Sequence, residues 1–249
     1  MINPKVSIIT VTFNAEKVLE RTLRSIKKQD YNNIESIIID GASTDGTLKI
    51  VEKYSDVVTK WISEKDNGLY DAMNKGISLA TGDYVWFLNA GDTICKSDVL
   101  NYFFSKESFM RDVYYGETVI VDENGKQIGD RRLKTKNNLT WKDFRMGMLV
   151  CHQSVLVKRE IAPEYNLKFK IAADYEWVLE SFKRAKYILG TKYKITCYLE
   201  GGLSRKNILK ANKERFLIMK KYYGLIPTLW FNFLMIFRFL YTVAKLRRI

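Results

Sequence analysis

The chain has 249 residues, of which 47% are hydrophobic and 28% are charged, and its formal net charge is +13 at pH 7. This length and composition allow a full hydrophobic core and argue against a disordered or low-complexity protein. The positive charge implies an anionic partner, which can be nucleic acid, a phosphorylated substrate or acidic lipid, unless it only reflects a lysine-rich solvated surface.

The three cysteines, Cys95, Cys151 and Cys197, are widely spaced and form no C-x-x-C pair. Their odd number and spacing argue against a disulfide framework or a structural zinc site, and favour a reducing compartment. No basic segment followed by a cleavable apolar segment precedes the first strand pattern, so the sequence gives no sign of secretion. We therefore expect a protein that faces the cytoplasm.

The first fifty residues predict a strand, a helix, a second strand and a short helix. Residues 5–13 form a β-branched apolar run, and Asn14 follows as a plausible helix cap. Apolar residues then recur at helical spacing from Ala15 to Ile26. Residues 34–39 read as the second strand, and a short helix is expected from about residue 47 to residue 54.

The next forty residues repeat this alternation. Residues 57–62 predict a third strand, residues 69–80 an amphipathic helix, and residues 84–88 a fourth strand after the turn Thr81-Gly82-Asp83. Strands that are apolar on both faces and alternate with helices are typical of a parallel sheet covered on both sides. The sequence therefore predicts an open α/β fold.

The pattern changes after Asp92. We expect a hairpin over residues 113–128, strands near residues 150–158, a helix over residues 173–185 and further strands up to Glu200. This organisation predicts a nucleotide-binding half, 1–92, and an acceptor-binding half, 93–205, that share one cleft. Residues 206–249 are expected to form C-terminal helices.

Polar side chains gather where the predicted parallel strands end, the edge at which open α/β sheets bind ligands. They are Asn14, Asp40, Glu64 with Asp66, and Asn89 with Asp92. Any one of them is explained by a turn or cap role, but clustered carboxylates repel one another unless a cation or donor groups offset their charge. The set as a whole fits Mg²⁺ or Mn²⁺ bound through one or two carboxylates and substrate phosphates.

Three sequence blocks resemble glycosyltransferase family 2, which has the GT-A fold: TVTFNAE, IIIDGASTDGT and SEKDNGLYDAMNKGISLATGDYVWFLNAGD, the last covering residues 63–92. Looser similarity continues through HQSVLVKRE and AADYEW. The resemblance implies an inverting transferase of the surface-polysaccharide type that uses a nucleotide-sugar, expected to be a UDP-sugar. It implies that the base and ribose are held by Thr10, Thr12, Asp40 and Asp66.

The resemblance also implies roles for the later blocks. Residues 89–92 fall where the family usually has a D-x-D metal motif, so Asn89 is a donor-binding candidate and Asp92 a metal ligand, although Asn89 and Gly91 replace frequent acidic residues. His152, the only histidine, is a second metal or diphosphate candidate, or a satisfied structural residue. Asp174 is placed as the general base, with Glu176 as the alternative and a helix-terminal charge as the purely structural role.

The segment from Leu225 to Ala244 is strongly apolar and about 20 residues long, which is near the length that spans a bilayer. Arg238 argues against a spanning helix, because a central arginine is costly in hydrocarbon. Thr228 and Asn232 share one side of this helix with Arg238, while Trp230, Phe233, Phe237 and Leu240 occupy the other side. With the flanking basic residues, the pattern favours a helix lying in an anionic membrane surface over a helix packed on protein.

These observations predict a peripheral enzyme at the cytoplasmic face of the plasma membrane that glycosylates a glycan or polyprenyl-diphosphate-linked acceptor. Three alternatives remain. A sugar-phosphate nucleotidyltransferase would share the sheet, but no glycine-rich phosphate loop follows the first strand. A nucleic-acid-binding protein is supported by charge but by no recognised motif, so we expect no nucleic-acid partner. A catalytically silent membrane scaffold would explain the missing carboxylates at positions 89 and 91.

Overall fold

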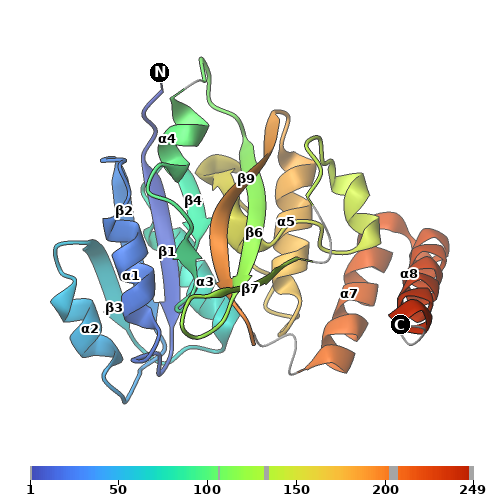
Figure 1. Ribbon diagram of the computed structural model, residues 1–249, viewed down its shortest axis with the longest axis horizontal. Coiled ribbons are helices and arrows are strands. Elements are labelled where there is room, and N and C mark those ends of the chain that lie inside the picture. Colours follow the sequence, from blue (N-terminus) through green and yellow to red (C-terminus); the bar gives the residue numbers. More distant parts are fainter. Residues whose placement is uncertain (1, 106, 132–134, 202–206, 247–249) are drawn as a thin grey trace.

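The computed structural model describes residues 2–105, 107–131, 135–201 and 207–246, with residues 238–246 described by their backbone alone (Figure 1). The first half alternates strands and helices as expected: β1 (Val6–Thr12), α1 (Leu19–Lys27), β2 (Ile34–Asp40), α2 (Thr47–Lys53), β3 (Val58–Ser63), α3 (Leu69–Leu79) and β4 (Tyr84–Phe87). The second half contains β5 (Thr93–Ile94), α4 (Val99–Phe104), β6 (Val113–Val121), β7 (Gln127–Asp130), β8 (Val155–Lys158), α5 (Ala173–Arg184), β9 (Ile188–Leu199), α7 (Ile208–Tyr223) and α8 (Leu225–Leu246).

One sheet runs through both halves in the order β3-β2-β1-β4-β8-β6-β9-β5, with β7 paired to β6. The strands β3, β2, β1 and β4 are parallel, and β8 then joins β4 in the antiparallel direction. The strand order of this parallel part, β3-β2-β1-β4, is the order expected of an open α/β fold. The sheet as a whole is mixed, and helices flank both of its faces in Figure 1.

Apolar residues of the sheet pack into two clusters, one on each face. One cluster joins β1 residues such as Val6 and Ile8 to α1, α2 and α4. The other joins the alternate β1 residues Ile9 and Val11 to α3, α5 and α7. Because successive side chains of a strand point to opposite faces, the continuous apolar runs of β1 and β2 are buried on both sides.

Asn14 is not the cap of the first helix, and this expectation was wrong. The helix begins at Leu19, and no side-chain hydrogen bond caps it. Asn14 has a positive φ of 47°, which asparagine tolerates better than most residues, and its Oδ1 accepts a hydrogen bond from the backbone N–H of Thr44. Asn14 therefore joins the loop after β1 to the loop after β2.

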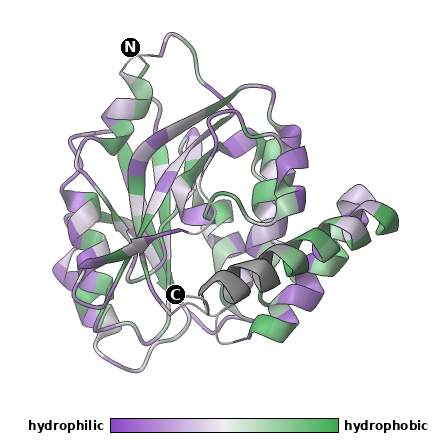
Figure 2. Cartoon of the chain, turned by 45° about the vertical axis from the view of Figure 1, so that its right-hand side comes forward, coloured by the Kyte–Doolittle hydropathy of each residue, from purple (hydrophilic) through white to green (hydrophobic). Residues whose placement is uncertain are grey.

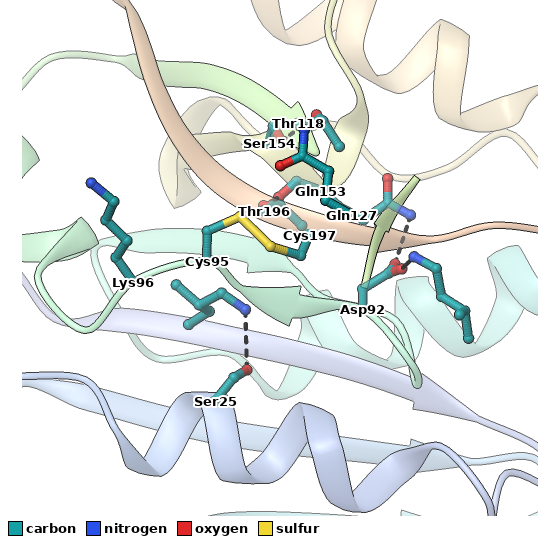
Figure 3. Close-up of a disulfide and its surroundings, with 12 residues drawn as sticks. Ser25, Asp92, Cys95, Lys96, Thr118, Gln127, Gln153, Ser154, Thr196 and Cys197 are labelled. Atoms are coloured by element: carbon teal, nitrogen blue, oxygen red, sulfur yellow. Dashed lines mark hydrogen bonds between the residues drawn. A yellow bond between two sulfur atoms is a disulfide. The ribbon is translucent and has the colours of Figure 1, made fainter. Parts of the chain in front are cut away.

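The structure contains a disulfide between Cys95 and Cys197, whose Cα atoms are 5.4 Å apart (Figure 3). The expectation that the cysteines would remain unpaired is wrong for these two, and Cys151 is free. Pairing of β5 with β9 brings the two cysteines together from positions 102 residues apart. Sequence spacing could not show this contact, because it is made by the sheet.

The two C-terminal helices pack beside each other at one side of the molecule, where Figure 2 shows α8 as a mainly hydrophobic helix. The polar face of α8 points inward: Thr228 is buried, and Asn232 Nδ2 lies 3.6 Å from Met219 Sδ of α7. Its apolar face is exposed, including Ile226, Leu229, Trp230, Phe233, Ile236 and Phe237. Among the described residues, no helix is long and apolar enough to cross a membrane.

Candidate active site

A cavity of about 420 Å³ lies beyond the carboxyl ends of the parallel strands and is lined by residues of both halves of the chain. Four of the residues expected at the site line it: Asn89, Asp92, His152 and Asp174. Asn89 and Asp92 follow β4, His152 begins a short 3₁₀ turn (His152–Ser154), and Asp174 lies in the first turn of α5. The fold therefore gathers polar groups from segments more than 60 residues apart, as the 61-residue separation of Asp92 and Gln153 illustrates.

Asp92 is a buried carboxylate with an exposed fraction of 3%. The backbone N–H of Leu199 donates to its Oδ1 at 2.8 Å, and Gln153 Nε2 donates to its Oδ2 at 3.0 Å. Burial raises the pKa of Asp92 to about 7, although these donors and the charge of His152 oppose the rise. Two donors do not fully replace the water that an ionised carboxylate loses, so a cation at this position would be favourable.

The two residues that replace the usual acidic ones near Asp92 have local reasons. Gly91 has a φ of +98°, and a Cβ built on it would lie 2.7 Å from Leu199 Cδ2, so position 91 accommodates only glycine in this backbone. Asn89 Oδ1 is buried and has no hydrogen-bond partner among the described residues. Position 91 therefore provides no ligand, whereas position 89 provides a free oxygen.

Asp174 and His152 lie side by side in the lining of the cavity. His152 Nδ1 lies 3.6 Å from Asp174 Oδ2, just beyond hydrogen-bond distance, and both ring nitrogens of His152 are buried without a partner among the described residues. Burial raises the pKa of Asp174, but His152, the charge of Arg215 and the N–H of Tyr175 lower it more, and the net shift is downward. Asp174 is therefore ionised near neutral pH and is able to accept a proton.

Glu176, the alternative base, lies elsewhere. It is buried, and it accepts hydrogen bonds from Asn166 Nδ2 at 3.0 Å and from Lys221 Nζ at 2.8 Å. These contacts belong to a separate groove between α5 and α7. The geometry therefore favours Asp174 over Glu176 for the base.

The other four expected donor-binding residues lie outside the cavity, along the ends of β1, β2 and β3. Thr12 pairs with Asp40 in the β1–β2 register, and the hydroxyl oxygens of Thr10 and Thr12 are buried without a partner among the described residues. Asp40 is fully buried and accepts hydrogen bonds from Ser43 and from Ser63 Oγ. In this part of the edge the Asp40 carboxylate is therefore already held by protein donors, whereas the two threonine hydroxyls are not.

Asp66 lies beside this strand end. A Cβ on Gly41 would come within 3.1 Å of Asp66 Oδ2 and 3.4 Å of the ring of Phe13. Lys75 Nζ forms ion pairs with Asp66 at 2.5 Å and with Glu64 at 2.8 Å. Phe13 is 65% exposed, so an open aromatic face, a carboxylate and a close-approaching glycine are adjacent.

The side chains that line the cavity and that sequence reasoning missed include Arg131, Gln153 and Arg215. Gln153 directly follows His152, but only the folded chain shows that it holds Asp92. Arg215 lies on α7, in a segment that we assigned to the C-terminal helices rather than to the site. Phe13 was within reach of sequence reasoning, because it stands in the TVTFNAE block.

The side chains of the cavity could supply only a few ligands to a metal ion. The described residues contain no group of three or more histidine, cysteine, aspartate or glutamate side chains that could hold an ion. Near Asp92, however, Asn89 Oδ1 and both nitrogens of His152 are without partners. Such a set fits Mg²⁺ or Mn²⁺ only when substrate phosphates or water complete the coordination.

Comparisons with known proteins place the chain in a family. The sequence model of glycosyl transferase family 2 matches residues 7–162. A PGL/p-HBAD biosynthesis glycosyltransferase of Mycobacterium bovis is 32% identical over 232 residues, covering 86% of this chain and 85% of the relative. An uncharacterized glycosyltransferase of Haemophilus influenzae is 29% identical over 189 residues, covering 74% of each protein.

Two solved structures share the fold. S. aureus TarS 1–349 in complex with UDP matches with a TM-score of 0.69 at 20% identity, covering 87% of this chain and 65% of that one. The mannosyltransferase PcManGT of Pyrobaculum calidifontis, in complex with GDP-Man and Mn²⁺, matches with a TM-score of 0.64 at 16% identity, covering 89% and 64%. This chain thus spans just under two thirds of each solved chain. It has the GT-A fold, belongs to glycosyl transferase family 2 and is a glycosyltransferase.

Proposed function

We propose that the protein transfers a sugar from a nucleotide-sugar, above all a UDP-sugar, to a hydroxyl group of a glycan acceptor, with inversion at the anomeric carbon. The observation that carries this proposal is the shared cavity, in which an ionised Asp174 lies beside His152 and near the under-satisfied Asp92. Solved neighbours of the same fold are complexes with UDP, UDP-GlcNAc and GDP-Man, which supports a nucleotide-sugar donor.

The nucleoside binds along the ends of β1 to β3 in this proposal. The open ring of Phe13 stacks on the planar base, a contact worth about 1–3 kcal/mol for bases on aromatic side chains in single-strand recognition. Thr10, Thr12, Asp40 and Asp66 surround the base and ribose. The unpartnered hydroxyls of Thr10 and Thr12 support this assignment, because buried polar atoms normally have a partner.

Asp174 accepts the proton of the attacking hydroxyl. Direct attack on the anomeric carbon, with departure of the nucleoside diphosphate from the opposite side, inverts the configuration. A positioned general base contributes about 10²–10⁴-fold in rate. Tyr70, whose hydroxyl lies 3.4 Å from Asp174 Oδ1, and the N–H of Tyr175 hold this carboxylate in place.

Asp92 would hold Mn²⁺ or Mg²⁺, with Asn89 and His152 as its neighbours. When bound, such an ion neutralises the diphosphate of the leaving group. Asp92 itself is fixed by Leu199 and Gln153, so its carboxylate keeps one orientation. One protein carboxylate with phosphate oxygens is a common arrangement for Mg²⁺.

In our proposal the acceptor is linked to lipid, and the enzyme takes part in surface polysaccharide biosynthesis. It binds peripherally to the cytoplasmic face of the plasma membrane. The exposed apolar face of α8 supports membrane binding, with Trp230 58% exposed, Phe233 60% and Phe237 63%. The net charge of +13 suits the anionic cytoplasmic leaflet. The Arg238, Thr242 and Lys245 side chains and residues 247 and 248, on which part of this expectation rested, lie outside the described residues.

The test of the transfer reaction is a screen of UDP-sugars and GDP-mannose for turnover with Mn²⁺, comparing the wild type with Asp92→Ala. We expect turnover of at least one donor, and loss of most metal-dependent turnover in the variant while its unfolding transition remains. No turnover of any donor, or wild-type rates for Asp92→Ala at saturating Mn²⁺, would contradict the proposal or the ligand assignment, respectively.

The test of the membrane surface is co-sedimentation with vesicles that contain anionic lipid. The triple variant Trp230→Gln, Phe233→Gln and Phe237→Gln removes apolar area from the exposed face without touching Thr228, Phe231 or Asn232 on the inner face. We expect it to stay in the supernatant at salt concentrations where the wild type sediments. Equal sedimentation of the two proteins would remove α8 from the membrane contact.

A further inference from the structure

Two arginines line the same cavity without a role in the chemistry described above. Arg131 follows β7, and Arg215 lies on α7. Arg131 Nη2 donates to the carbonyl oxygen of Met148 at 2.8 Å, but its Nη1 is buried and has no partner among the described residues. Arg215 Nε is likewise buried without a partner there.

A guanidinium group is cationic and has only hydrogen-bond donors. A buried N–H of a charged group that finds no acceptor is unfavourable, so an anion is expected to complete the site. Two carboxylates of the cavity already accept hydrogen bonds from other donors, Asp92 from Gln153 and Leu199, and Asp174 from Tyr175.

The position of Arg215 is fixed by its neighbour in the sequence. Glu214 is 7% exposed, and it accepts hydrogen bonds from the backbone N–H groups of Lys170, Ile171 and Ala172 at 3.0, 2.8 and 2.9 Å. These N–H groups belong to the loop that leads into α5, so Glu214 attaches α7 to the segment that carries Asp174. Arg215 therefore stays near Asp174, whose pKa its charge helps to lower.

We propose that Arg131 and Arg215 form a diphosphate-binding site within the cavity, which acts in addition to a cation at Asp92. The inference rests on the proposed function, because it takes the donor or the acceptor as the source of the diphosphate. Guanidinium groups suit phosphate oxygens through their planar forked donors. The donor is our choice of source, since Asn89, Asp92 and Asp174 share the cavity with both arginines.

This site explains how a single carboxylate can be sufficient at the metal position. The leaving nucleoside diphosphate carries its charge on phosphate oxygens, and two guanidinium groups neutralise part of it. The enzyme should therefore keep measurable affinity for a nucleoside diphosphate when the divalent metal is removed. The nucleoside contacts contribute to this affinity as well, so the part due to the arginines is measured as the difference between the wild type and the arginine variants in EDTA.

The experiment is calorimetric titration of the full-length protein with UDP, and separately with farnesyl diphosphate, each in Mn²⁺ and in EDTA. The variants are Arg131→Gln and Arg215→Gln, with Arg215→Lys as the conservative change. Arg184→Gln is the matched control, because Arg184 is an exposed arginine that pairs with Glu180 at 3.0 Å on the surface of α5. Thermal unfolding of every variant checks that the fold is intact.

We expect each glutamine variant to bind UDP between about tenfold and a hundredfold more weakly, in EDTA as well as in Mn²⁺, with Arg215→Lys between them and the wild type. Arg184→Gln should bind as the wild type does. Weakened binding of farnesyl diphosphate with unchanged UDP binding would keep the diphosphate site but assign it to the acceptor. Folded variants that bind both probes like the wild type would overturn the site while leaving the proposed transfer intact, whereas a wild type that binds neither probe in any condition would overturn both.

Discussion

Two buried carboxylates lie at opposite ends of the same parallel sheet, and their surroundings differ. Glu35, at the start of β2, is 1% exposed, and Asp92, beyond the end of β4, is 3% exposed. Glu35 accepts hydrogen bonds from Ser7 Oγ, from Thr81 N–H and Oγ–H at 2.6 and 2.7 Å, and from Gly82 N–H at 2.9 Å, and it pairs with Lys5 at 2.9 Å. Asp92 has two donors.

The pKa values follow the number of donors. Burial raises the pKa of Glu35, but its hydrogen bonds with Ser7, Lys5 and Thr81 lower it more, to about 2. Burial dominates at Asp92 and raises its pKa to about 7. Glu35 at the amino edge is thus satisfied within the protein, whereas Asp92 at the carboxyl edge is left for a ligand.

Most of the unsatisfied neutral polar atoms of the sheet also lie toward the carboxyl edge. The buried atoms without hydrogen-bond partners among the described residues include five near that edge, Thr10 Oγ1, Thr12 Oγ1, Asn89 Oδ1, and His152 Nδ1 and Nε2, and one near the amino edge, Ser36 Oγ. Such atoms lower stability unless a ligand completes them. Buried polar groups without hydrogen-bond partners therefore identify the ligand-binding edge of the sheet.

The largest expected effect is on catalysis. Asp174→Asn keeps the shape of the side chain but cannot accept the proton, so kcat should fall by about 10²–10⁴-fold with nearly unchanged donor affinity. Steady-state kinetics combined with titration of UDP measure both quantities. Glu176→Gln is the control, and it should leave kcat per folded molecule near the wild-type value, because Glu176 contacts Asn166 and Lys221 in the separate groove.

The opposite outcome would reassign the two acidic residues. If donor affinity collapsed in Asp174→Asn while bound donor still reacted, Asp174 would belong to donor binding. Loss of kcat in Glu176→Gln would then make Glu176 the leading base.

The second prediction concerns the amino edge. Glu35→Ala leaves the N–H groups of Thr81 and Gly82 and the ammonium group of Lys5 without their acceptor, and the free energy of unfolding should fall by about 3–5 kcal/mol. Urea unfolding at pH 7 measures the change, and turnover per folded molecule should stay constant. Glu35→Gln retains an acceptor oxygen and should cost less. A loss of turnover larger than the loss of folded protein would show that the amino edge also serves catalysis.

These two residues show what sequence reasoning can reach. Asp174 was proposed from the resemblance of the AADYEW block, and the strand and helix order of the first 92 residues followed from periodicity. Glu35 stands inside an apolar strand run and was not noticed, because its five partners come from residues 5, 7, 81 and 82. Only pairing of β1, β2 and β4 brings those residues together.

For the site, too, the sequence indicated single residues but not the contacts that the fold makes between them. Asn89, Asp92, His152 and Asp174 were proposed one by one, but the sequence could not show that these four line one cavity that excludes Asp40 and Asp66. Arg215 was missed because residues 206–249 were assigned to the C-terminal helices and not to the site. The position of Arg215 depends on Glu214, which accepts hydrogen bonds from three backbone N–H groups of the loop before α5. This contact produces no periodic pattern in the sequence.

The third prediction concerns the covalent tie at the carboxyl edge. Cys95 lies three residues after Asp92, and Cys197 lies two residues before Leu199, which donates to Asp92. Cys95→Ser should lower the free energy of unfolding by about 2–4 kcal/mol without reductant, since the closed loop restricts the unfolded chain. The wild type in reductant should match the variant, and Cys151→Ser, at the free cysteine, should show no dependence on reductant. Three free thiols in the native wild type would exclude the bond.

The last and smallest effect is the pH dependence of stability, which the two carboxylates should change in opposite directions. The pKa of Asp92 is raised from 3.8 to about 7, so the folded state binds more protons than the unfolded state between these values. Stability contributed by this group therefore falls as the pH rises from 4 to 7 and levels off above 7. Asp92→Asn removes this decline, and its free energy of unfolding relative to the wild type should rise by on the order of 1–3 kcal/mol across that range.

Glu35 supplies the matched control for this pH series, because its pKa is lowered from 4.5 to about 2. Its contribution to stability is present above pH 4.5 and is lost as the pH falls toward 2, so Glu35→Gln should flatten the acid limb and leave the range from pH 5 to 7 unchanged. Urea unfolding of the wild type and both variants from pH 3 to 8 separates the two windows. If Asp92→Asn ran parallel to the wild type between pH 4 and 7, Asp92 would be ionised throughout. The carboxyl edge would then be as well satisfied as the amino edge, and the contrast between them would not mark the site.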